Sequence, residues 1–86
     1  MQIKILPKAE KGYLRLPNLI QKKAHKAILA LSQNPRPTSL RTKKMKGLVD
    51  RWEARIDYSY RLTFTVIDDT LIIMTMGMHD EGLGKK

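Results

Sequence analysis

Cysteine is absent from this chain of 86 residues, and histidine occurs only twice, as His25 and His79. A chain without thiols forms no disulfide and no thiolate metal site, and two histidines are too few for a closed zinc site. We therefore expect no metal, no cofactor and a reducing compartment, the cytoplasm. No apolar stretch has the length of a membrane-spanning helix or of a signal peptide, so we expect neither membrane insertion nor export.

Acidic residues are scarce as well: eight stand against 17 Lys and Arg, and the formal net charge is +9. Residues 1–46 contain 12 basic residues and a single acidic one, Glu10, which gives +11; residues 47–86 contain five basic and seven acidic residues, which gives −2. A polycationic half attracts a phosphate polymer or an acidic protein partner. A lysine-rich surface that serves only solubility is the alternative.

The length and the 42% hydrophobic content predict one small globular domain over residues 1–86. Period-two alternation and strand-forming residues predict strands at Gln2–Leu6, Trp52–Asp57, Tyr60–Ile67 and Leu71–His79. Helical spacing predicts a short helix over Lys8–Leu16 and a longer one from Pro17 to Asn34, which ends before Pro35. Residues 35–47 have neither period and are expected to form an exposed loop. The short segments between the last three strands predict hairpin turns.

This order of elements predicts an α+β fold, β-α-α-β-β-β, with two helices packed on one face of a twisted antiparallel sheet. Alternation directs one set of strand residues toward the helices: Trp52, Ala54, Ile56, Leu62, Phe64, Val66, Ile72, Met74 and Met76. The opposite face then collects a polar set: Glu53, Arg55, Arg61, Thr63, Thr65, Thr75 and His79. We expect this second face to be open and functional.

Several short segments together resemble the RelE/ParE superfamily of toxins from bacterial type II toxin–antitoxin systems. They are Asn34-Pro35, Lys44-Met45-Lys46-Gly47, Trp52-Glu53-Ala54-Arg55-Ile56, Tyr60-Arg61-Leu62 and Asp68-Asp69. The ending Gly77-Met78-His79-Asp80 is similar to the Gly-x-His-x-Asp type of ending in the YafQ branch, whose members are ribosome-dependent mRNA endonucleases. The resemblance covers nearly the whole chain and depends on the order and spacing of the segments. It implies a cytosolic toxin neutralised by a cognate antitoxin, with mRNA cleavage at the ribosome or, as in the ParE branch, inhibition of DNA gyrase.

Metal-independent RNA cleavage requires a cation for the phosphoryl charge and groups that accept and donate protons. Arg61 aligns with the strand arginine of the family and is the candidate for the charge role, with Arg55 as a second cation. His79 aligns with the histidine of the resembling ending and titrates near neutrality, so it is the candidate for proton transfer. The alternatives are ion pairs of the arginines with neighbouring carboxylates, Glu53 or Asp57 in the case of Arg61, and a solvated terminal histidine.

The basic cluster of Arg41, Lys43, Lys44 and Lys46 is expected to contact the phosphate backbone rather than bases, or else to be a solvated loop. His25, which stands among lysines, is expected on the helix surface. Two departures from the family pattern weaken the enzyme interpretation: Glu81-Gly82-Leu83 has no aromatic residue, and Glu53 occupies a position where some relatives use lysine. A catalytically inactive, antitoxin-binding module of the same fold is therefore a further alternative.

Overall fold

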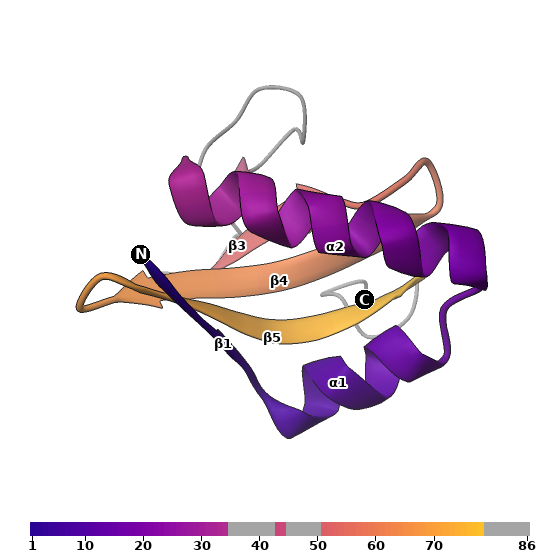
Figure 1. Cartoon of the computed structure of the whole chain (residues 1–86), viewed down its shortest axis with the longest axis horizontal. Coiled ribbons are helices and arrows are strands. Elements are labelled where there is room, and N and C mark those ends of the chain that lie inside the picture. Colours follow the sequence, from indigo (N-terminus) through magenta and orange to yellow (C-terminus); the bar gives the residue numbers. More distant parts are fainter. Residues whose placement is uncertain (35–42, 45–50, 79–86) are drawn as a thin grey trace.

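The computed structural model describes residues 1–34 and 51–78, and the backbone path of Lys43 and Lys44 (Figure 1). The elements are β1 (Gln2–Ile5), α1 (Pro7–Leu14), α2 (Asn18–Gln33), β2 (Lys43–Lys44), β3 (Trp52–Arg55), β4 (Tyr60–Ile67) and β5 (Thr70–Met78). The predicted α+β class and the order of the four long strands and two helices are confirmed. β2 is an addition, because Lys43 and Lys44 lie within the segment that was predicted to be a loop and pair instead with β3.

The two helices follow from the prolines that precede them and from one apolar stripe. Pro7 stands in the first turn of α1, where its missing N–H leaves no hydrogen bond unmade, and Pro17 immediately precedes α2. The predicted stripe of α2 is buried: Ile20, Ala24, Ala27, Ile28 and Leu31. Neither of the described helices is long and apolar enough to cross a membrane.

The strands form one sheet in the order β1-β5-β4-β3-β2. β3, β4 and β5 are an antiparallel meander, as predicted, but β1 pairs with β5 in parallel. The sheet is therefore mixed, and the prediction of a wholly antiparallel sheet is wrong at this edge. The apolar pattern of β1 defines which residues form the strand, but it contains no information on the direction of the strand beside it.

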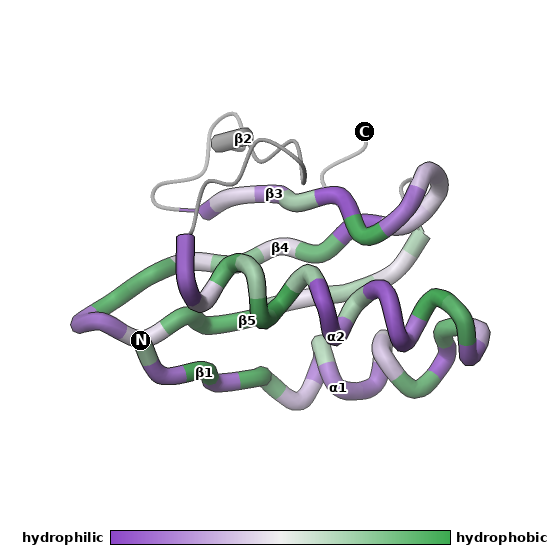
Figure 2. The backbone as a smooth tube through the Cα atoms, turned by 45° about the horizontal axis from the view of Figure 1, so that its top comes forward, coloured by the Kyte–Doolittle hydropathy of each residue, from purple (hydrophilic) through white to green (hydrophobic). Residues whose placement is uncertain are grey.

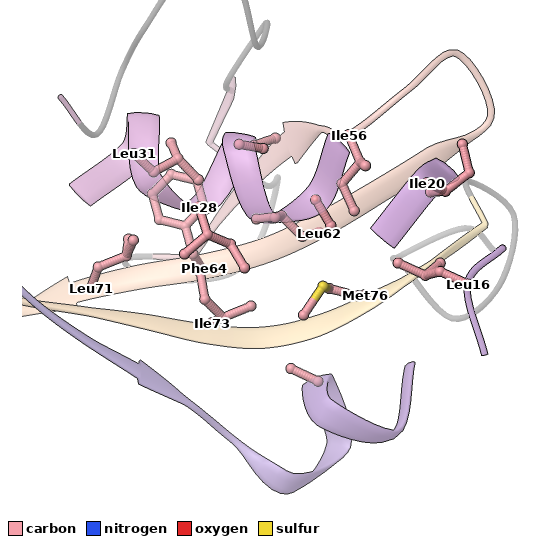
Figure 3. Close-up of a cluster of buried hydrophobic side chains, with 14 residues drawn as sticks. Leu16, Ile20, Ile28, Leu31, Ile56, Leu62, Phe64, Leu71, Ile73 and Met76 are labelled. Atoms are coloured by element: carbon pink, nitrogen blue, oxygen red, sulfur yellow. The ribbon is translucent and has the colours of Figure 1, made fainter. Parts of the chain in front are cut away.

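The core lies between α2 and the sheet face that it covers (Figure 1). Leu62, Phe64 and Ile73 point from the sheet toward α2, where Ile28 and Leu31 meet them (Figure 3). Burial of such side chains contributes about 1.5–3 kcal/mol each relative to an exposed position. This layer packs one face of the sheet against α2, so the opposite face is left to the polar side chains of β3, β4 and β5.

A β-bulge changes which side chains of β5 point into the core, so the predicted set is partly wrong. Thr63 pairs with Thr75 but the next residue, Phe64, pairs with Ile73, so Met74 is an extra residue in β5. Before the bulge the buried positions are therefore Leu71 and Ile73, and not Ile72 and Met74 as the simple alternation predicted. After the bulge the predicted facing is restored, and Met76 is buried. Val66, near the end of β4, is also more exposed than predicted.

Gly12 permits the close approach of α1 to β5. A Cβ atom added to Gly12 would overlap the backbone carbonyl oxygen of Met76, and a strand backbone cannot move away as a flexible side chain can. We expect Gly12→Ala to lower the free energy of unfolding by about 1–3 kcal/mol, the usual cost of forcing an atom into a packed contact. Urea unfolding measures this loss. Lys11→Ala, at an exposed position of the same helix, is the control and should leave the stability almost unchanged; an equal effect of both variants would contradict this interpretation.

Candidate nucleic-acid interface

Two arginines lie side by side on the sheet face that points away from α2. Arg55 of β3 is directly opposite Arg61 of β4, and Arg61 is directly opposite Gly77 of β5. Residues that are directly opposite point to the same face, and the sequence neighbours Ala54 and Leu62 are buried in the core under α2. The three residues therefore form an arginine row, Arg55–Arg61–Gly77, in which the glycine has no side chain of its own.

Arg61 is held by backbone carbonyls rather than by a carboxylate. Its Nη1 donates to the carbonyl oxygens of Asp57 at 2.9 Å, Tyr58 at 3.1 Å and Tyr60 at 3.1 Å. The predicted alternative, an ion pair with Glu53 or Asp57, is absent from the described residues. Carbonyl groups have no net charge, so the guanidinium is fixed in place without being neutralised.

Arg55 has an unmet hydrogen-bonding requirement. Its Nε atom is buried and, among the described residues, no acceptor bonds to it. Like charges directly opposite one another on neighbouring strands repel, so Arg55 also lies in the unfavourable field of Arg61. The repulsion falls when an anion lies between the two guanidinium groups. A buried donor without a partner is uncommon in proteins unless a ligand, an ordered water or a function accounts for it.

Asp57 and Glu53 are the carboxylates nearest to Arg55 in the sequence, and the hydrogen bonds of Asp57 go elsewhere. One of its oxygens accepts the backbone N–H of Tyr58 at 2.6 Å and lies 3.4 Å from Nζ of Lys23 on α2. The Tyr58 N–H lowers the pKa of Asp57 below its ordinary value, and the Lys23 ammonium and the charge of Arg55 act in the same direction against the effect of burial. Asp57 is thus ionised at neutral pH and forms its described ion pair with Lys23 rather than with the arginines.

The neighbouring row of side chains on the same sheet face is largely buried. Glu53, Thr63 and Thr75 lie directly opposite one another across β3, β4 and β5, and the hydroxyls of the two threonines are 2.6 Å apart. Glu53, Thr63 and Thr65 are buried, which corrects the expectation that the whole polar face is accessible. The arginine row is therefore the part of this face where a ligand can meet a cation.

The other predicted site residues are only partly described. The backbones of Lys43 and Lys44 pair with Glu53 and Trp52, which places β2 on the far side of β3 from Arg61. Arg41, Lys46 and His79 lie outside the described residues, as does Glu81-Gly82-Leu83. β5 ends at Met78, directly opposite Tyr60 and at the same end of the sheet as the arginine row, and His79 is the next residue in the sequence. Within the described ranges, no cluster of His, Asp and Glu could hold a metal ion.

Sequence reasoning missed the carbonyl groups that hold Arg61. Backbone carbonyls have no signature in a sequence, because any residue supplies one. The only available signal was the turn composition of residues 57–59, which predicted a hairpin but not its contact with Arg61.

A second feature is an apolar groove of about 460 Å³ between β1, α1 and α2. It is lined by Ile3, Ile5, Glu10, Tyr13, His25, Ile28, Leu29 and Met76. Ile5 and Leu29 are 44% and 48% exposed, respectively, although both are apolar, and His25 is exposed on α2 as the sequence predicted. Figure 2 shows apolar residues alternating with polar ones along β1 at the edge of the sheet. Lysines are plentiful in the elements that form this groove: Lys4, Lys8, Lys11, Lys22, Lys23 and Lys26, against Glu10 alone.

Comparison with solved structures shows that the chain has the fold of the RelE and YoeB/ParE toxins, which confirms the fold that the sequence resemblance predicted. The archaeal RelE in the RelE–RelB complex from Pyrococcus horikoshii is 21% identical with a TM-score of 0.78, over 94% of this chain and 97% of that one. The YoeB/ParE toxin from Agrobacterium tumefaciens is 18% identical with a TM-score of 0.81, over 92% and 99%.

A chain of the heterotetrameric YoeB–YefM complex from Staphylococcus aureus is 23% identical, with a TM-score of 0.77 over 92% of this chain and 97% of that one. No protein-family model and no curated protein matches the sequence. The likeness is therefore one of fold, and the activity has to be inferred from the site.

Proposed function

We propose that the chain is the toxin of a toxin–antitoxin pair and that it inhibits translation by cleaving mRNA on the ribosome. The observation that carries this proposal is the arginine row, in which two guanidinium groups lie directly opposite on one sheet face and the buried Nε of one of them has no acceptor among the described residues. A phosphodiester supplies the anionic oxygens that this arrangement lacks. The likeness in fold to proteins named as RelE and YoeB toxins supports the same class of function.

The proposed reaction begins with attack of a ribose 2′-hydroxyl on the adjacent phosphate. The 2′-oxygen forms a bond to phosphorus while the bond from phosphorus to the 5′-oxygen breaks, which leaves a 2′,3′-cyclic phosphate and a 5′-hydroxyl end. Arg61 and Arg55 stabilise the negative charge that grows on the phosphoryl oxygens. His79 transfers a proton, either from the attacking hydroxyl or to the departing oxygen. Arg41, Lys43, Lys44 and Lys46 hold the RNA backbone or the ribosome by charge.

Purified chain incubated with mRNA on translating ribosomes tests this proposal. We expect rapid cleavage of the ribosome-bound message and little cleavage of the same RNA free in solution. Intact mRNA, together with inhibited supercoiling in a parallel gyrase assay, would contradict mRNA cleavage and favour a ParE-like inhibition of DNA gyrase. If neither mRNA cleavage nor gyrase inhibition is observed, the chain is a catalytically inactive module with the same fold.

We further propose that the partner is an acidic antitoxin that binds the apolar groove and acts in the cytoplasm. Structures with this fold include complexes of RelE with RelB and of YoeB with YefM. The groove offers exposed apolar side chains, and the lysines of β1, α1 and α2 give its surroundings a positive charge. An acidic segment with one apolar face satisfies both features when it orders on binding.

Leu29→Asp should weaken binding of the proposed antitoxin by about tenfold or more, because burial of an unpaired charge opposes docking. Toxicity in the absence of the antitoxin should be unchanged, since Leu29 is distant in the fold from the arginine row. The control is Leu19→Asp, another exposed leucine of α2 that does not line the groove. Titration calorimetry measures both affinities, and equal weakening by the two variants would remove the groove from the interface.

A further inference from the structure

We propose that Asp57 is a positioning residue for Arg61: it holds the turn of residues 57–60 in the shape that gathers three carbonyl oxygens around Arg61 Nη1. This inference deepens the proposed function, because it assigns a support to the cation that is proposed to bind phosphate. It is carried by the contacts within the β3–β4 hairpin and by one ion pair to α2.

The turn is closed by backbone hydrogen bonds between its two ends. The N–H groups of Ile56 and Asp57 donate to the carbonyl of Tyr60 at 2.9 and 3.2 Å, and the N–H of Tyr60 donates to the carbonyl of Asp57 at 3.3 Å. These bonds fix the ends, but the peptide between Asp57 and Tyr58 needs a further restraint. The Asp57 carboxylate supplies it by accepting the Tyr58 N–H at 2.6 Å. That peptide includes the Asp57 carbonyl, which makes the shortest of the three contacts to Arg61.

Lys23 connects the turn to the helix layer. Its ammonium lies 3.4 Å from the same carboxylate oxygen that accepts the Tyr58 N–H. The pair is partly exposed, so its direct contribution to stability is small. Its consequence is geometric, because it ties the Asp57 side chain to α2, which is fixed on the sheet by the hydrophobic core.

Arg61 needs support because the residue directly opposite carries the same charge and repels it. Arg55 is directly across the strand pair, and a mobile Arg61 side chain would lower the repulsion by moving into solvent. Three carbonyl contacts on one nitrogen oppose that movement. Nε and Nη2 form no hydrogen bond with the described residues, so these groups are available to a phosphate. A cation that is already in place when the substrate arrives needs no reorganisation during the reaction.

Nitrogen-15 NMR of the arginine side chains tests the positioning without any RNA. In the wild type, we expect separate Nη1 and Nη2 signals for Arg61, because the three carbonyls block rotation about the Nε–Cζ bond. Asp57→Ala should merge the two signals, whereas Asp57→Asn, whose amide oxygen still accepts the Tyr58 N–H, should keep them separate. Lys23→Gln should speed the rotation, and Lys22→Gln, an exposed lysine on the same helix, should not. Separate signals in Asp57→Ala, or unchanged rotation in Lys23→Gln if the alanine variant does not fold, would overturn the proposal.

Cleavage measurements then connect the positioning to the chemistry. Asp57→Ala should lower kcat about tenfold with little change in KM, because it disorders a group that acts on the transition state. In an Arg61→Ala background the same change should have no further effect, since residues that act as a unit are not additive. Equal losses in both backgrounds would show that Asp57 does not act through Arg61. Absence of cleavage by the wild type would contradict the proposed function and leave the NMR result as the test of the positioning.

Discussion

Arg61→Ala is expected to lower the rate of mRNA cleavage on the ribosome by a factor on the order of 10² or more, because it removes the fixed cation from the phosphoryl charge. It should also lower the free energy of unfolding by about 1–3 kcal/mol, since the carbonyls of Asp57, Tyr58 and Tyr60 lose their common donor. Single-turnover cleavage and urea unfolding measure the two effects.

Two further variants separate the role of Arg61 from a general loss of structure. Arg61→Lys keeps the charge but not the planar fork, so it should restore part of the binding and little of the cleavage rate. His79→Ala should remove the limb of the pH–rate profile that titrates near neutrality, whereas Arg61→Ala should leave that limb in place. Wild-type cleavage by Arg61→Ala would exclude the arginine row from the chemistry, and wild-type cleavage by His79→Ala would show that His79 is an ordinary residue.

Arg55→Met is expected to have effects of opposite sign on activity and on stability. Cleavage should fall by a factor on the order of 10², because one of the two cations at the phosphate is lost. Stability should be unchanged or should rise by about 1 kcal/mol, since the variant removes the repulsion of Arg61 and a buried donor for which the described part of the chain offers no acceptor. A methionine of similar length keeps the side-chain packing.

The matched control for this variant is Arg15→Met, which removes the same charge at an exposed position after α1. It should leave both cleavage and stability close to those of the wild type. If Arg55→Met destabilises the protein and leaves cleavage intact, Arg55 is a structural residue and the single observation that carries the proposed function is lost.

The elements of the fold were largely predictable because their signals are local. The stripe from Ile20 to Leu31 and the break at Pro35 define α2, and the alternation in Tyr60–Ile67 defines β4 with its observed bounds. The two-residue turn at Asp68 and Asp69 was also visible as a turn, and both residues adopt positive φ angles of 50° and 59°. The parallel pairing of β1 and the bulge at Met74 were not predictable, because they depend on which strands meet and in what register.

The candidate site was predictable only as far as side chains define it. Alternation placed Arg55 and Arg61 on one face of neighbouring strands, and the register sets them directly opposite. The burial of Glu53 and Thr63 on that face has no local signal, since polar residues in an alternating strand normally face solvent. The support of Arg61 by the hairpin turn was equally invisible, because an arginine beside two carboxylates favours an ion pair in any sequence-based interpretation.

The most direct test of the central claim is a map of 5′-hydroxyl RNA ends in cells that express the chain without its antitoxin. Attack by the 2′-hydroxyl leaves these ends, so the wild type should produce them at many positions within translated regions and at none in untranslated RNA. Arg55→Met should fold normally and reduce them to the background of uninduced cells. Growth arrest with intact messages, or identical maps for the wild type and Arg55→Met, would contradict the assignment of the arginine row as the site of RNA cleavage.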